Sequence, residues 1–269
     1  MSEMLNIYIK KFFIAAMAPS MRSPSGITGW FARRLMRSAN PESTRYAFRH
    51  RLNNNNLESS SSGGVFVELG AGEGSGLLAL TEHEDPSRIP SAIHLVEISD
   101  VMRAELERVV REDLPESVRA SDTLIEVHGE DCRSMPYLGD DSVDTVFAMN
   151  VVYFLDPLRD YLGELHRVLK PGTGEIVWGC KFDKVPKDNE VFVNVREDEI
   201  VRMMEETGFE VTSEAIDVAA AMIGGAKDGE CSAADKSRNT NGGAAAETLS
   251  AANDMRNYIE IRGRKIQHS

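Results

Sequence analysis

Cysteine is scarce in this 269-residue chain, and its three cysteines, Cys132, Cys180 and Cys231, are scattered. They form neither a disulfide framework nor a CxxC pair with metal-ligand spacing. We therefore expect a reduced, cytoplasmic protein without a metal site. Long apolar runs are also missing: none approaches the roughly 20 residues that a membrane span needs, so we expect no integral membrane insertion.

Positive charge is scarce beyond the first fifth of the chain. The formal net charge is −13, yet residues 1–51 carry a net charge of +7, which leaves −20 for the remainder. An acidic body repels phosphate backbones, so a nucleic-acid partner is disfavoured. The basic N-terminal arm could still contact an anionic partner, a membrane surface or a small substrate.

Composition divides the chain into an α/β domain, residues 65–269, and a variable N-terminal part. Residues 1–20 are expected to form a mobile or targeting-like segment, for which an amphipathic helix, an organellar presequence and a secretory signal are the alternatives. Residues 21–52 are expected to form a helical lid, and the Asn/Ser/Gly-rich stretch 53–64 a linker. Residues 224–253 have almost no large apolar side chains, so we expect a disordered insert there.

Short apolar, β-branched runs alternate with helical spacing along the domain. The expected strands are Val65–Leu69, Ala92–Ile98, Thr123–His128, Val143–Asn150, Glu175–Cys180, Phe209–Val218 and Tyr258–Lys265. This alternation predicts a doubly wound, seven-stranded, mostly parallel sheet with helices on both faces. No crossover helix precedes the last strand, so we expect it to pair antiparallel at that edge.

The strongest local motif is the run Val65-Phe66-Val67-Glu68-Leu69-Gly70-Ala71-Gly72-Glu73-Gly74-Ser75-Gly76. It predicts a strand, a glycine-rich turn and a helix whose free N–H groups face a ligand. The spacing fits neither the G-x-G-x-x-G dinucleotide motif nor a P-loop. Glu68, two residues before the first glycine, suits a cationic or amino-bearing ligand better than a pyrophosphate.

Two further acids follow the next strands. Glu97 ends the second expected strand, where a carboxylate can accept hydrogen bonds from both hydroxyls of a ribose. Asp131 follows the third strand in Gly129-Glu130-Asp131-Cys132 and is a candidate acceptor for an adenine amino group. Because carboxyl ends of parallel strands share one edge of a sheet, we expect both acids beside the glycine loop.

Together these motifs resemble the class I S-adenosylmethionine-dependent methyltransferases, and specifically their ubiquinone/menaquinone-biosynthesis branch. The resemblance runs from about Arg22 to Lys181. It is carried by the stretches Glu68–Gly74, Gly129–Asp131 with Met135-Pro136-Tyr137, Asp141–Val146 and Leu165–Gly172. It implies a Rossmann-like fold and transfer of a methyl group by in-line displacement to a small molecule. Lipophilic molecules are among the acceptors that the resemblance allows.

The resemblance also implies roles for individual residues. The expected contacts of S-adenosylmethionine are Glu68, Gly70, Ala71, Gly72, Gly74, Glu97, Ile98, Asp131, Cys132 and Asn150. Asn150 and Tyr153 are expected to position the reactants, and Trp30, Asn40 and Tyr153 to contact the acceptor. We name no catalytic base, because methyl transfer needs one only when the acceptor loses a proton late.

Two other functions remain open at this point. The chain could be a non-catalytic relative that binds the cofactor or a partner protein, although such a scaffold has no need of Glu68, Glu97 and Asp131 together. An aminopropyl transferase would need an acidic polyamine pocket after the fourth strand. The stretch Asn150-Val151-Val152-Tyr153 is not acidic, which disfavours the aminopropyl transferase hypothesis.

Overall fold

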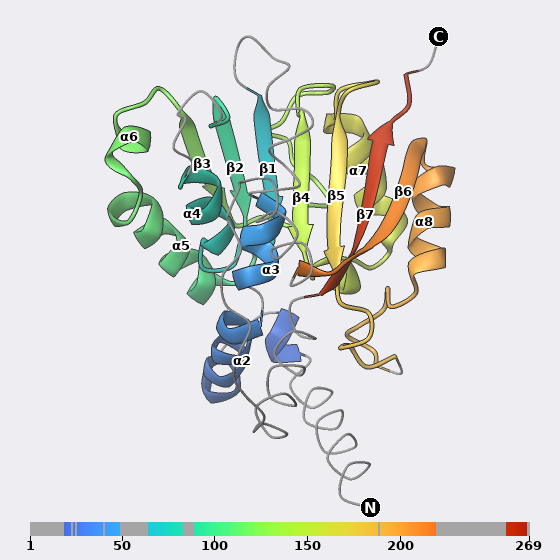
Figure 1. Ribbon diagram of the computed structural model, residues 1–269, viewed down its shortest axis with the longest axis horizontal. Helices are drawn as coiled ribbons and strands as arrows, with labels where there is room; N and C mark the ends of the chain where they lie inside the picture. The colour runs from blue at the N-terminus through green and yellow to red at the C-terminus, as the bar shows by residue number, and fades with distance from the viewer. Residues whose placement is uncertain are drawn as a thin grey trace, which may run out of the picture.

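A seven-stranded sheet forms the centre of the protein (Figure 1), with the strand order β3-β2-β1-β4-β5-β7-β6. The computed structural model describes residues 19–22, 24, 26–39, 41–48, 64–82, 89–187, 189–218 and 257–267. The strands are β1 (Val65–Leu69), β2 (Ala92–Val96), β3 (Leu124–His128), β4 (Thr145–Met149), β5 (Glu175–Cys180), β6 (Phe209–Ile216) and β7 (Tyr258–Lys265).

Five strands, β1 to β5, are parallel, and β7 runs antiparallel to both β5 and β6. The chain proceeds from β1 outward through β2 to β3 and then returns to place β4 on the other side of β1. The order of strands therefore reverses between β1 and β4. In open α/β sheets, ligands bind in the crevice at the carboxyl ends of the strands at such a reversal.

Helices cover both faces of the sheet and its carboxyl edge (Figure 1). Their bounds are α2 (Gly26–Ala39), α3 (Pro41–Tyr46), α4 (Ser75–Thr81), α5 (Asp100–Glu112), α6 (Glu116–Arg119), α7 (Leu158–Val168) and α8 (Glu197–Glu206), with a short 3-10 turn η3 (Val152–Phe154). Helices α4 and α5 pack on one face through Leu77, Leu80 and Leu106, and α7 packs on the other. Helix α2 lies beyond the carboxyl ends of the strands.

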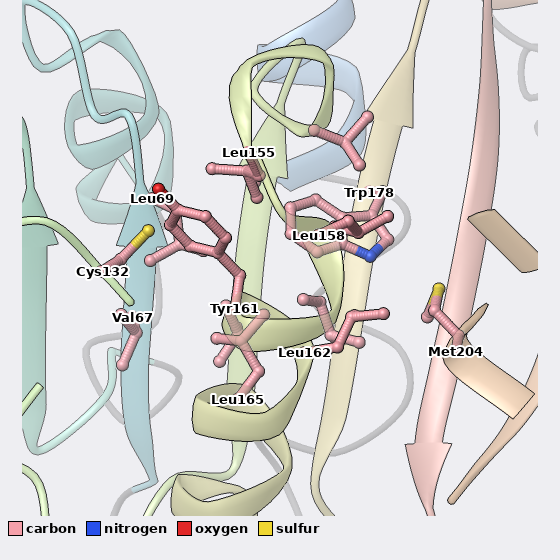
Figure 2. Close-up of a cluster of buried hydrophobic side chains, with 14 of the residues drawn as sticks. Val67, Leu69, Cys132, Leu155, Leu158, Tyr161, Leu162, Leu165, Trp178 and Met204 are labelled. Atoms are coloured by element: carbon pink, nitrogen blue, oxygen red, sulfur yellow. The ribbon is translucent and has the colours of Figure 1, made fainter. Parts of the chain in front are cut away.

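The larger apolar core lies between the sheet and α7 (Figure 2). Leu158, Leu162 and Leu165 recur at helical spacing and are almost fully buried. They pack in one cluster with Val67 and Trp178 of the sheet. Burial of such side chains contributes about 1.5–3 kcal/mol each. This core holds β1, β4 and β5 rigidly side by side, which fixes where their carboxyl ends lie.

The seven strands and the helix from residue 158 confirm the sequence predictions, and no strand end differs from its expected position by more than two residues. The last strand is antiparallel as expected, but it lies between β5 and β6, so that β6 is the outermost strand. Residues 1–18, 53–63 and 224–253 lie outside the described residues, as does Asn40. No helix in the described part of the chain combines the length and apolar character needed to cross a bilayer.

Candidate functional site

A cavity of about 340 Å³ opens at the carboxyl ends of the central strands, beneath α2. Nine of the ten predicted cofactor contacts line it: Glu68, Gly70, Ala71, Gly72, Glu97, Ile98, Asp131, Cys132 and Asn150. They come from the ends of β1, β2, β3 and β4, on both sides of the reversal in strand order. The structure therefore brings together residues that are more than 80 positions apart in the chain.

The glycine loop after β1 needs residues that tolerate left-handed backbone. Gly70, Gly72 and Gly74 have φ of 63°, 60° and 89°, which costs a non-glycine residue conformational energy. The amides of Gly70 and Ala71 donate to the carbonyl oxygen of Val96, at 2.8 and 3.1 Å, and tie the loop to the end of β2. This arrangement holds the loop backbone against the cavity.

Gly74 is the one predicted cofactor contact that does not line the cavity. A Cβ atom at this position would lie 3.0 Å from a methyl carbon of Leu106 and 3.2 Å from one of Val109, both on α5. Gly74 also occupies the N-cap position of α4. Its requirement for glycine therefore comes from the start of α4 and its packing on α5.

Glu68 is a buried carboxylate on the cavity wall. Its side chain is 4% exposed, and within the described residues Oε2 has no hydrogen-bond partner. Burial, reinforced by the neighbouring charge of Glu97, raises the pKa of Glu68 to about 8. An ionised carboxylate in such a place is costly unless a cation or hydrogen-bond donors reach it, so the site favours a ligand that supplies a cationic group there.

Gly76, in the first turn of α4, makes room for the Glu68 carboxylate. A Cβ atom on Gly76 would lie only 2.1 Å from Oε1 of Glu68. Gly76, the last glycine of the glycine-rich stretch, thus makes space for the acid that precedes the stretch. The sequence motif contains Gly76, but its contact with Glu68 follows only from the folded arrangement.

Glu97 binds the glycine loop from the end of β2. Its Oε2 accepts a hydrogen bond from the amide of Gly72 at 2.9 Å, and its Oε1 accepts one from the amide of Ser99 at 2.8 Å. Burial raises the pKa of Glu97, although the two backbone donors act in the opposite direction. Each carboxylate oxygen can accept a second hydrogen bond, so Glu97 can still receive ligand hydroxyls.

The far wall of the cavity is formed by the turn after β3. Oδ2 of Asp131 accepts a hydrogen bond from the hydroxyl of Tyr161 at 3.1 Å, which positions the carboxylate. Burial raises the pKa of the neighbouring Cys132 thiol to about 12, so Cys132 is an apolar wall rather than a nucleophile. Ile98 is 44% exposed and presents an apolar surface to the cavity.

Asn150 lies at the end of β4 with a positive φ of 59°. The hydroxyl of Tyr153 donates to Oδ1 of Asn150 at 3.3 Å and accepts a hydrogen bond from the amide of Lys181. Tyr153 is 1% exposed and is not among the lining residues, so it acts behind the wall and holds Asn150. Burial raises the pKa of Tyr153 well above its ordinary value, which excludes it as a base near neutral pH.

Helix α2 lies in the stretch 21–52 that the sequence predicts to form a lid, and it supplies the lining residues Arg33, Met36 and Arg37. Arg33 and Arg37 both form ion pairs with Glu73 of the glycine loop, with 2.5 Å between Arg33 Nε and Glu73 Oε1. Trp30, by contrast, is 56% exposed and does not line the cavity. The basic pair at positions 33 and 37, one helical turn apart, is the signal that marks this contact.

Residues 67–176 match a family model described as a methyltransferase domain. No curated protein matches the sequence. Among solved structures, a chain of the complex between the Haloferax volcanii Trm112 methyltransferase activator and a methyltransferase is similar with a TM-score of 0.56 and 19% identity; the match covers 90% of this chain and 96% of that one.

Two further structures are similar at the level of the fold. One is Haemonchus contortus phosphoethanolamine N-methyltransferase 2 with phosphomonomethylethanolamine and S-adenosylhomocysteine, at a TM-score of 0.55, 17% identity and coverage of 96% of this chain and 61% of that one. The other is the [4+2]-cyclase SpnF, at a TM-score of 0.52 and 18% identity, and the match covers 95% of this chain and 93% of that one. The chain therefore has the Rossmann-like α/β fold of class I methyltransferases, and its residues 67–176 match the methyltransferase-domain model.

Proposed function

We propose that the protein is an S-adenosylmethionine-dependent methyltransferase acting on a small molecule. The observation that carries the proposal is the buried Glu68 carboxylate, whose Oε2 has no partner among the described residues and which lies beside a cavity at the strand-order reversal. The cavity volume of about 340 Å³ falls within the range of small-ligand pockets. The match of residues 67–176 to the methyltransferase model supports the same assignment.

The residues of the cavity fit this cofactor group by group. Glu68 would hold the cationic amino end of the methionine portion, and Glu97 the two ribose hydroxyls. Asp131 would accept from the adenine amino group, while Ile98 and Cys132 pack against the ring. The bound cofactor supplies an activated methyl group together with its own leaving group.

The protein's own contribution is to position the reactants and to exclude water. Asn150, held by the Tyr153 hydroxyl, would orient the acceptor near the methionine portion. Helix α2, held to the glycine loop by Arg33, Arg37 and Glu73, would cover the cavity as a lid. Proximity and orientation of this kind can lower a barrier by about 7–11 kcal/mol.

We further propose a lipophilic acceptor. Met21, Met36, Phe154 and Leu155 line the cavity on the side of α2 and η3 and give that side an apolar surface. The resemblance to the ubiquinone/menaquinone branch points to the same class of molecule. A screen of metabolite extracts with labelled S-adenosylmethionine, followed by mass identification of the product, tests this part of the proposal; labelled products that are all strongly polar would contradict it.

Substitution of Glu97 tests the assignment of the ribose. The change Glu97→Ala should weaken S-adenosylmethionine binding by about 1–3 kcal/mol, because both ribose hydrogen bonds and the link to Gly72 are lost. Glu107→Ala, an exposed acid on α5, is the matched control and should leave the affinity unchanged. Calorimetric titration of the cofactor measures both variants, and an unchanged dissociation constant for Glu97→Ala would refute the ribose contact.

The alternative is a protein of this fold that does not transfer methyl groups. The similarity to the cyclase SpnF shows that the fold hosts other chemistry. Cofactor binding without any labelled product in the extract screen would favour this alternative. No cofactor binding at all would exclude the methyltransferase and leave only a scaffold that binds a partner protein.

A further inference from the structure

Three potential metal ligands meet on the sheet away from the cavity. His94 lies on β2, and Glu126 and His128 lie on β3. In the parallel register His94 is paired with Glu126, and Val96 with His128. Residues two apart on a strand point to the same face. All three side chains therefore project from one face, which is the α7 face because Val96 belongs to the core beneath α7.

The three ligand atoms are spaced as a metal ion would require. His94 Nδ1 lies 3.1 Å from His128 Nε2 and 3.4 Å from Glu126 Oε2. His128 Nε2 and Glu126 Oε2 are 3.8 Å apart. In a tetrahedral site with bonds of about 2.0–2.2 Å, ligand atoms lie about 3.3–3.6 Å from one another. The three atoms thus approximate one triangular face of a tetrahedron, with its fourth corner left for water.

The surroundings fix two of the three ligands and leave the third open to solvent. The side chains of His94 and His128 are only 8% and 12% exposed, so both imidazoles are held within the fold. Glu126 is 45% exposed and gives an ion a path from solvent. The ring of Tyr137 stacks on His128 at 3.6 Å between centroids and fixes the imidazole plane, as outer contacts of metal ligands commonly do.

We propose that His94, Glu126 and His128 bind one divalent transition-metal ion of the Zn²⁺ class. Two neutral imidazoles and one carboxylate are a donor set that Zn²⁺ accepts with an open fourth position. The ion would join β2 to β3, and β3 is the edge strand of the sheet. It would thereby also fix the backbone of His128, whose carbonyl oxygen accepts from the amide of Glu97 at 2.9 Å. The proposal does not depend on methyl transfer.

Competition titration of untagged, full-length, EDTA-treated protein with Zn²⁺ and a chromophoric chelator tests the site. We expect one equivalent to bind and to raise the melting temperature by several degrees, since the ligands are assembled only in the folded chain. His94→Gln, Glu126→Gln and His128→Gln should each weaken binding at least tenfold. His166→Gln and Glu107→Gln, which replace a histidine and a glutamate elsewhere, are the matched controls and should bind as the wild type does.

Two outcomes would overturn the site: no stoichiometric Zn²⁺ binding, or binding that all three ligand variants retain. Circular dichroism in EDTA shows whether each variant folds. If the buried histidines cannot be replaced, the half-exposed Glu126 decides the question. Titration with Co²⁺ gives an independent readout, because four-coordinate nitrogen and oxygen ligation produces strong visible absorption that Glu126→Gln should diminish.

Discussion

At the scale of single residues, the carboxyl group of Glu68 is the feature that links sequence to function. It is placed by β1, given room by Gly76 and removed from water by the fold. A folded protein gains no stability from an ionised group held this way. Such a cost is typical of a functional site, where a ligand supplies the missing partner.

The free-energy cost of ionising the buried Glu68 carboxyl should appear in how the stability of the ligand-free protein depends on pH. Its pKa is about 8 in the folded state against 4.5 for a free glutamate. Between these two values the unfolded chain releases the proton while the folded protein must keep it, so the folded state loses stability as the pH rises from 4.5 towards 8. Below pH 4.5 the carboxyl is protonated in both states and nothing is lost. The variant Glu68→Gln has no such loss, so its stability advantage over the wild type should grow by about 5 kcal/mol between pH 4.5 and pH 8.5.

Urea unfolding of both proteins between pH 4.5 and 8.5 measures this difference. The stability gap between variant and wild type should widen steadily with pH, because other titrating groups are shared and cancel. A gap that is constant or that narrows over this interval would show that the Glu68 carboxyl is not desolvated in the folded protein.

The sequence predicts which residues line the cavity at the strand ends better than it predicts the arrangement of α2 and Tyr153. Glu68 lies near the end of β1, and Glu97 and Asp131 follow β2 and β3, so the parallel topology alone brings them to one edge. The basic pair Arg33 and Arg37 is visible in the sequence, but Glu73 lies 40 residues from Arg33, so local spacing does not identify Glu73 as its partner. The aromatic character of Tyr153 and Trp30 likewise does not show that one is buried behind Asn150 and the other exposed.

At the scale of secondary-structure elements, α4 must form a stable helix and also leave space for the Glu68 carboxyl beside its first turn. Its first turn carries Gly76, where alanine would improve helix propensity but displace Glu68. Helix α7 carries Gly163, where an added Cβ would have no atom within 4 Å among those described. The two glycines are therefore a matched pair that separates backbone effects from effects on the site.

Gly163→Ala should stabilise the protein by about 0.5–1 kcal/mol, as expected for a glycine replaced within a helix. Gly76→Ala should gain nothing and should weaken cofactor binding at least tenfold, because Glu68 must move away from its position. Urea unfolding and cofactor titration measure the two effects. Equal stability gains with equal affinities would show that Gly76 is not needed for Glu68.

The order of the last two strands illustrates what a local pattern cannot predict. Their apolar alternation indicates strands, and the lack of a crossover helix indicates antiparallel pairing. Neither feature specifies that β7 enters between β5 and β6, since that depends on which strand edges are free when the chain returns. The cluster of His94, Glu126 and His128 was missed for the same reason, because it exists only once β2 and β3 are in register.

At the scale of the whole molecule, the connection between β6 and β7 is longer than the sheet requires. Ile216 at the end of β6 is paired directly with Tyr258 at the start of β7. The amide of Val218 also donates to the side chain of Asn257, which closes the hairpin just beyond the strands. A much shorter loop can make this connection.

Deletion of residues 226–250 should therefore leave the melting temperature within about two degrees of the wild type, because the hairpin contacts remain and a shorter loop costs less closure entropy. Differential scanning calorimetry of the shortened chain measures it. A loss of several degrees would show that the deleted segment packs on the domain.

Equilibrium binding of labelled S-adenosylmethionine to the wild type and to Glu68→Gln at pH 8 is the most direct test of the central claim. The account predicts one saturable site per wild-type chain and at least tenfold weaker binding in the variant, even though the variant is the more stable protein without ligand. Absence of saturation at millimolar cofactor, or equal affinity in the two proteins, would contradict it.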